Sequence, residues 1–141
     1  MTLPKRVLAA QATKDNWTGV AFQWGRHDCA KLVAWHLRVM GHEVRLAKAG
    51  SYRTAIGARR ALRNMGFASL SDALDSRFER WPAPAFALPG DIVIGEGDDA
   101  AFEAMGVWLG NGALLGFHER TGAAGVLRGK ALAAAWRVDP A

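Results

Sequence analysis

The sequence has only one cysteine, Cys29, so no disulfide bond can form within the chain. One thiol and four scattered histidines also match none of the spacings of structural zinc sites. Neither a metal nor another cofactor is therefore expected. The thiol of Cys29 is left with two roles, packing in the core or chemistry.

Long apolar runs are missing as well. No segment approaches the roughly 18 to 20 residues that span a bilayer, and residues 1–11 lack the apolar stretch and cleavage site of a signal peptide. Repeats, linkers and low-complexity tracts are also absent. With 141 residues, half of them apolar, the chain is expected to form a single domain over residues 1–141.

Acidic residues are scarce in the first part of the chain. Residues 1–63 hold twelve of the 18 Lys and Arg but only three of the 13 Asp and Glu, within a net charge of +5. Arg59, Arg60 and Arg63 lie in a helical pattern without the interleaved aromatic residues of single-strand binders. A solvated face is favoured, and a basic nucleic-acid-binding module stays open as an alternative.

Residues 1–66 have a mainly helical pattern. A short helix is expected after Pro4, followed by a loop that contains Trp17. The next helix begins after Asp28, a natural N-cap residue, and ends at Gly41. Its apolar face is made by residues at helical spacing, namely Cys29, Leu32, Val33, His36, Leu37 and Met40. A further helix is predicted from about Thr54 to Met65.

Residues 67–89 are predicted to form one helix, from Ser69 to about Phe78, and a Pro-rich connection. Residues 90–141 have the pattern of antiparallel strands instead, with Asn111-Gly112 as a hairpin turn. Strands are expected at 91–94, 104–109, 113–117 and 126–127, followed by a closing segment at 132–138 with Trp136 as its anchor. The order indicates an α+β fold, with helices packed on one face of an antiparallel sheet.

Cys29 is the residue with the clearest chemical potential. At a helix N-terminus its sulfur faces free N–H groups, which lower a thiol pKa and favour the nucleophilic thiolate. Packing as a small apolar side chain is the alternative. Among the neighbours, Asp28 is expected to cap the helix, His27 to lie in the loop, and His36 to be a satisfied core histidine.

The segment from Phe22 to Ala30, which contains Trp24-Gly25-Arg26-His27-Asp28-Cys29, resembles the nucleophile motif of the NlpC-type, papain-like cell-wall cysteine peptidases. Residues 89–93 and 106–112 resemble that family's first strand and following hairpin. Together with Tyr52-Arg53-Thr54 and residues 135–138, these motifs look like a branch found among tail genes of long-tailed phages and gene transfer agents. The resemblance implies Cys29 as nucleophile, with Trp24 and Asp28 in support.

The resemblance also shows two departures. Active members of the family carry the general-base histidine two residues before the glycine that matches Gly106, and a polar orienting residue ten residues after it. Here these positions hold Ala104 and Gly116. His118 is the nearby substitute, because its even offset from Gly116 would place it on the same strand face.

The sequence and the resemblance together indicate three alternative functions. The first is a structural part of a phage, or phage-like, tail tip or baseplate hub with a degenerate peptidase site. It would be made in the bacterial host cytoplasm and bound to hub, distal tail or central fibre proteins. The second is an active cysteine peptidase that cleaves peptidoglycan stem peptides, with Cys29 as nucleophile and His118 as base. The third is the nucleic-acid module.

Docking on tail proteins would require exposed anchor residues. Aromatic residues and arginine are enriched at binding hot spots. Four of the six tryptophans, Trp24, Trp35, Trp108 and Trp136, are expected in the core. The interface candidates are therefore those in predicted loops and the arginines nearby, namely Trp17, Trp81, Arg77 and Arg80.

Overall fold

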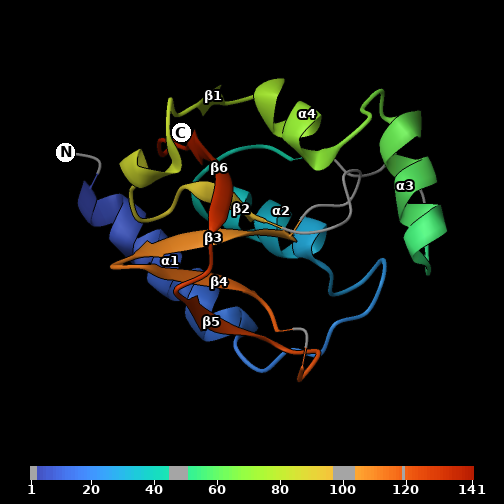
Figure 1. The fold of residues 1–141 in the computed structure, drawn as a ribbon, viewed down its shortest axis with the longest axis horizontal. Helices are drawn as coiled ribbons and strands as arrows, with labels where there is room; N and C mark the ends of the chain where they lie inside the picture. The colour runs from blue at the N-terminus through green and yellow to red at the C-terminus, as the bar shows by residue number, and fades with distance from the viewer. Residues whose placement is uncertain (1–2, 45–50, 97–103, 119) are drawn as a thin grey trace.

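The computed structural model describes residues 3–44, 51–96, 104–118 and 120–141. Its helices are α1 (Leu3–Trp17), α2 (Cys29–Val39), α3 (Ala55–Asn64) and α4 (Leu70–Asp75), with a short 3₁₀ helix η2 (Pro84–Phe86). The strands are β1 (Glu79–Arg80), β2 (Ile92–Gly95), β3 (Ala104–Gly110), β4 (Ala113–Phe117), β5 (Ala124–Arg128) and β6 (Leu132–Arg137). Figure 1 shows α1 and α2 behind the sheet and α3 at the edge of the molecule.

The strands form one antiparallel sheet in the order β1-β6-β2-β3-β4-β5. The hairpin predicted at Asn111-Gly112 joins β3 to β4, and both residues have the positive φ that this turn requires. The last strand, β6, returns to pair with β2 instead of extending the meander past β5. The α+β fold with a C-terminal antiparallel sheet is therefore confirmed.

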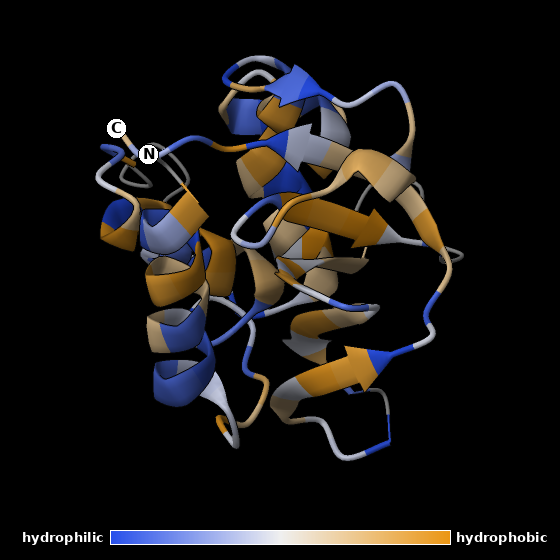
Figure 2. Cartoon of the chain, turned by 90° about the vertical axis from the view of Figure 1, so that its left-hand side faces the viewer, coloured by the Kyte–Doolittle hydropathy of each residue, from blue (hydrophilic) through white to orange (hydrophobic). Residues whose placement is uncertain are grey.

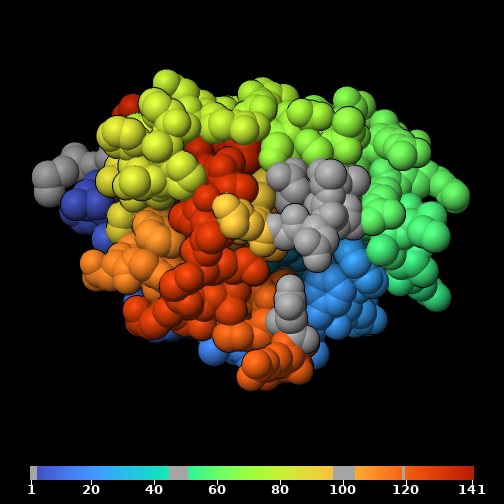
Figure 3. All heavy atoms as spheres, in the orientation of Figure 1, coloured from blue at the N-terminus to red at the C-terminus, as the bar shows by residue number. Residues whose placement is uncertain are grey.

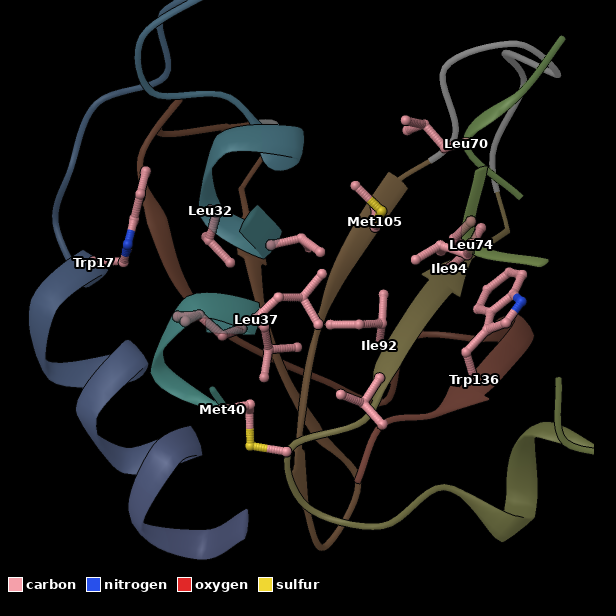
Figure 4. Close-up of a cluster of buried hydrophobic side chains, with 14 of the residues drawn as sticks. Trp17, Leu32, Leu37, Met40, Leu70, Leu74, Ile92, Ile94, Met105 and Trp136 are labelled. Atoms are coloured by element: carbon pink, nitrogen blue, oxygen red, sulfur yellow. The ribbon is translucent and has the colours of Figure 1, made fainter. Parts of the chain in front are cut away.

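Alternation along β2 separates two apolar layers. Ile92 and Ile94 face the main core, whereas Val93 faces a smaller cluster on the other side of the sheet. The main core joins all four helices to the sheet, and Figure 4 shows its largest side chains between α2, α4 and the strands. Figure 2 shows the central strands in hydrophobic colours. The helices therefore pack on one face, as the sequence predicts.

Two helices differ from their predicted bounds. Helix α1 extends to Trp17, whose side chain is only 6% exposed and lies in the main core, so the prediction of a loop position for Trp17 is wrong. Helix α4 ends at Asp75, three residues earlier than expected. The chain then turns into β1, which pairs with β6 and was not predicted. None of the helices in the described ranges is long and apolar enough to cross a membrane.

Candidate functional site

Asp28 forms the N-terminal cap of α2 and places Cys29 at the first position of the helix. One carboxylate oxygen, Oδ1, accepts the Lys31 backbone N–H at 2.9 Å. The other, Oδ2, accepts the Gly25 N–H at 3.0 Å and the Tyr52 hydroxyl at 2.7 Å. The side chain of Asp28 is fully buried. Its predicted role as a cap is confirmed, and it also ties the preceding loop and Tyr52 to the helix.

Gly25 is required in this loop for two reasons. Its φ is +83°, a conformation that L side chains rarely adopt. A Cβ at this position would also collide with the backbone carbonyl of Tyr52. Glycine is therefore required at position 25 because the backbone of Tyr52 packs directly against it. This close approach places the Tyr52 hydroxyl within hydrogen-bond distance of the Asp28 carboxylate.

The thiol of Cys29 is less acidic than predicted. Burial raises its pKa to about 12, and the negative charge of Asp28 acts in the same direction. Backbone N–H groups of Met105, Ala30 and Cys29 itself oppose this shift but do not reverse it. The predicted depressed pKa is therefore wrong, because the amides at the helix start do not offset lost hydration and a neighbouring carboxylate. At neutral pH the group is a thiol.

Cys29 opens into a pocket of about 180 Å³. Ala104 at the start of β3 and Gly116 on β4 both line it, so the structure brings together the three positions that the sequence motifs singled out. Aromatic rings form one wall, where Phe22 meets Trp24 and Phe117 edge to face at 4.9 and 5.2 Å between ring centroids. The remaining described lining residues are Met105, Leu114, Leu127 and Lys130.

None of the described histidines lines this pocket. His118 follows the end of β4, and its ring lies against β5, where a Cβ at Gly125 would stand 3.3 Å from it. His27 is exposed in the loop, with its ring 5.9 Å from that of Trp17. His36 is fully buried: its Nε2 donates to the Gly90 carbonyl at 2.8 Å and its Nδ1 lies 2.7 Å from the Thr13 hydroxyl. The core role predicted for His36 is confirmed.

Comparison with sequence families relates the chain to a described domain. The model of a domain of unknown function, DUF6950, matches residues 2–138. The chain belongs to the DUF6950 family. No curated protein matches its sequence.

Solved structures relate this DUF6950 domain to a known fold. NlpC2 and NlpC1 from Trichomonas vaginalis both align with a TM-score of 0.60 and 16% identity, over 95% and 94% of this chain. The chain spans 47% and 45% of those two proteins, about half their length. The P60 domain of an M. avium subspecies paratuberculosis antigen aligns over 94% of this chain and 93% of its own, with a TM-score of 0.50 and 16% identity. The domain therefore has the papain-like NlpC/P60 fold.

Two residues near the Cys29 pocket of the DUF6950 domain were not singled out from the sequence. Tyr52 belonged to a matching motif, but its bond to Asp28 depends on a contact between distant segments. Burial, and then Asp28, raise the pKa of Tyr52, so it stays a neutral donor. Lys130 lies before β6, with its alkyl chain across Gly95, the partner of Ala104 in the sheet. In the sequence, the one sign of such an approach is Gly95, which directly follows the β-branched run 92–94.

A second motif carboxylate, Asp91, supports the fold of the DUF6950 domain instead of a reaction. Its side chain is fully buried. The carboxylate accepts hydrogen bonds from the Arg6 guanidinium at 2.7 Å and from the Trp81 indole N–H at 2.8 Å. It also accepts hydrogen bonds from the backbone N–H groups of Leu88 and Val138. Arg6, itself 1% exposed, also reaches Asp139 at 2.5 Å. Asp91 thus joins α1, the η2 connection and the end of β6.

The four interface candidates lie in different environments. Trp17 is buried within the chain, which removes it as an anchor. Trp81 is half-buried, stacked on Phe86 with ring centroids 6.0 Å apart. The exposed Arg77 donates to the Glu43 carbonyl at 2.8 Å, and Arg80 pairs with Asp75 at 2.8 Å while lying over the Trp136 ring. Among the described residues, no group of three or more His, Cys, Asp or Glu could hold a metal ion.

Proposed function

We propose that this DUF6950 domain is a structural component of a phage or phage-like tail tip, built on a peptidase fold whose catalytic site is degenerate. The observation that carries the loss of catalysis is the composition of the Cys29 pocket. Ala104 and Gly116 stand where the resemblance expects a base and an orienting group, and Lys130 is the other titratable residue among the described lining residues.

Peptide cleavage by a thiol needs a proton acceptor for attack and a proton donor for the leaving amine. An alanine methyl and a glycine hydrogen supply neither. The raised pKa of Cys29, about 12, further lowers the thiolate fraction at neutral pH. Loss of groups that act as a unit can reduce turnover by about 10⁶. This chemistry supports an inert site.

The motif residues that carry the phage-branch resemblance have structural partners instead. Asp28 caps α2 and holds Tyr52, and Asp91 joins three elements of the fold. Trp136 is fully buried and donates its indole N–H to Asp75 at 2.8 Å. Retention of these residues is therefore accounted for by the demands of the fold, without a requirement for catalysis.

An exposed apolar cluster supports docking on other tail proteins. We name it the η2 patch, and it consists of Trp81, Phe86 and Leu88. Phe86 is 57% exposed and Leu88 39%. Arg137 lies over the Trp81 ring at 5.7 Å, which gives the aromatic and arginine composition of binding hot spots. Figure 3 shows the surrounding segment, residues 79–90, on the surface of the molecule. Hub, distal tail or central fibre proteins are the proposed partners, within the virion.

Two measurements test this function. Purified protein should release no fragments from peptidoglycan or stem peptides above the level of Cys29→Ala. In particles, the double variant Phe86→Ser with Leu88→Ser should fold but be lost from the tail, whereas Val39→Ser, at an exposed apolar position elsewhere, should be retained. Turnover that disappears in Cys29→Ala would refute the degenerate site, and normal incorporation of the double variant would refute docking through the η2 patch.

An active cysteine peptidase is the second candidate. It is favoured by the position of Cys29 at the start of α2, beside the pocket, where the Met105 backbone N–H reaches the thiol. Peptidoglycan would then be the substrate. If the substitution His118→Ala reduces turnover, His118 is the base. If turnover is unchanged in that variant, Lys130→Met tests Lys130 as the base.

A further inference from the structure

A second cavity lies between α2, α3, α4 and the start of β3. Its volume is about 170 Å³, and among the described residues it shares only Met105 with the Cys29 pocket. Figure 4 shows Leu37, Leu70, Leu74 and Met105, four of its lining residues, turned toward a common interior. We refer to this cavity as the helical groove.

The helical groove is open because its walls are rich in alanine. Its lining includes Ala30 and Ala34 on α2, Ala58 and Ala61 on α3, and Ala73 on α4. These side chains end at Cβ, so the helices do not fill the space between them to the density of a normal interior. An apolar cavity of about 150 Å³ holds a molecule the size of benzene. The groove therefore has room for an apolar group of roughly six to eight carbons.

The two hydroxyl groups on the groove already have partners within the chain. The Tyr52 hydroxyl donates to Asp28 at 2.7 Å, and the Ser76 hydroxyl donates to the Ala73 carbonyl at 2.6 Å. A peptide backbone placed here would have to bury its own N–H and C=O groups with few partners, which is unfavourable. An alkyl chain has no such groups. The lining therefore favours a hydrocarbon over a peptide segment.

The rim of the groove carries positive charge. Lys31, whose Nζ lies 6.0 Å from the Tyr52 ring centroid, and Arg77, which donates to the Glu43 carbonyl, both line it. None of the described lining residues is acidic. Arg60 and Arg63 are exposed on α3 but are not among the described residues that line the groove. The groove thus combines an apolar interior with a cationic rim.

We propose that the helical groove binds a free medium-chain carboxylate, with the alkyl chain between the helices and the carboxylate at Lys31 or Arg77. This proposal is independent of peptidase activity and of tail assembly. A membrane surface presents the same chemistry in a different form, and the experiment separates the two sources.

Sodium octanoate, octylammonium chloride and octanol serve as the probes, measured by calorimetric titration of the full chain below their micellar concentrations. Octanoate should bind at least tenfold more tightly than octylammonium, and octanol should lie between them. Lys31→Gln and Arg77→Gln together should remove most of this preference. Arg60→Gln, a matched loss of charge outside the groove lining, should leave it unchanged.

Filling the groove provides the second arm. Ala61→Phe should weaken octanoate binding at least tenfold, and Ala73→Leu, at a half-buried position that tolerates change better, should weaken it several-fold. Ala85→Leu adds the same side chain at an exposed site outside the groove and is the control. Equal binding of octanoate and octylammonium, or unchanged binding by a folded Ala73→Leu protein, would overturn the proposal. Binding to anionic vesicles without binding to octanoate would also overturn it, in favour of a membrane surface.

Discussion

Asp28 and Asp91 are the two buried aspartates among the described residues, and their hydrogen-bond partners differ in one respect. Both are 0% exposed, and both accept several N–H or O–H donors. The donors to Asp91 include a buried cation, the Arg6 guanidinium at 2.7 Å. The hydrogen-bond donors to Asp28 among the described residues are all neutral, namely two backbone amides and the Tyr52 hydroxyl.

This difference bears directly on the thiol. A carboxylate that is hydrogen-bonded but not neutralised still disfavours a second negative charge beside it. Asp28 therefore acts with burial to raise the pKa of Cys29. A paired carboxylate such as Asp91 instead stabilises the junction of α1 with the sheet. The two regions thus use the same residue type differently: Asp28 disfavours a negative charge on the neighbouring thiol, whereas Asp91 pairs with a buried cation.

The largest effect is expected from breaking the Asp91 junction. Asp91→Ala leaves the Arg6 guanidinium buried without its main partner and removes acceptors from two backbone N–H groups, so unfolding free energy should fall by about 3–5 kcal/mol. Urea denaturation measures this. The exposed Arg80–Asp75 pair is the control, and Arg80→Ala should cost about 1 kcal/mol or less. Similar losses in both variants would contradict the importance of burial.

The buried His36, which bonds the Gly90 carbonyl next to Asp91, predicts a pH dependence of stability. Burial lowers the pKa of His36 to about 4 from 6.5, so the folded state resists protonation while the unfolded state accepts it. The contribution of neutral His36 to the free energy of unfolding is fully present above pH 6.5. It is lost as pH falls toward 4, which lowers the free energy of unfolding by about 3 kcal/mol. Denaturation series from pH 7.5 to 4 measure the slope. His36→Gln should flatten it, and an unchanged slope in that variant would assign the effect to other groups.

A smaller effect separates Gly25 from other glycines with positive φ. Gly25→Ala adds a backbone collision with Tyr52 to the cost of its left-handed conformation, whereas Gly66 (φ +94°) has open space around it. We expect Gly25→Ala to lose about 2 kcal/mol more than Gly66→Ala, which should itself lose about 1 kcal/mol. Thermal unfolding of the two variants measures the difference. Equal losses would mean that the loop relaxes around the new methyl group.

Local patterns predicted much of this structure. Asp28, Thr54 and Ser69 are the N-caps of α2, α3 and α4, and each accepts a backbone N–H as these residue types predict. The Asn111-Gly112 turn was also predicted correctly. These features depend on a few neighbouring residues, which is why the sequence alone reveals them.

Long-range contacts account for what was missed. Trp17 is the last residue of a helix and does not lie in a loop, because its indole packs in the core. There it contacts the ring of Phe117, which lies 100 residues later in the sequence. The Tyr52–Asp28 bond and the position of Lys130 beside Ala104 also depend on segments that the fold brings together. The thiol pKa was predicted in the wrong direction because the helix start was given more weight than burial against Trp24 and Trp108, and because the effect of the Asp28 charge was not considered.

The smallest effect tests whether Asp28 lowers the reactivity of the Cys29 thiol. Asp28→Asn keeps a carbonyl oxygen for the cap but removes the negative charge, so the pKa of Cys29 should fall below about 12. Because the thiolate is the reactive form, alkylation by iodoacetamide at pH 8 to 9 should become several-fold faster in the folded protein. Asp72→Asn, which removes an exposed carboxylate on α4, is the control. An unchanged rate in a folded Asp28→Asn protein would show that burial alone keeps the thiol protonated, and that the contrast between the two aspartates has no effect on the site.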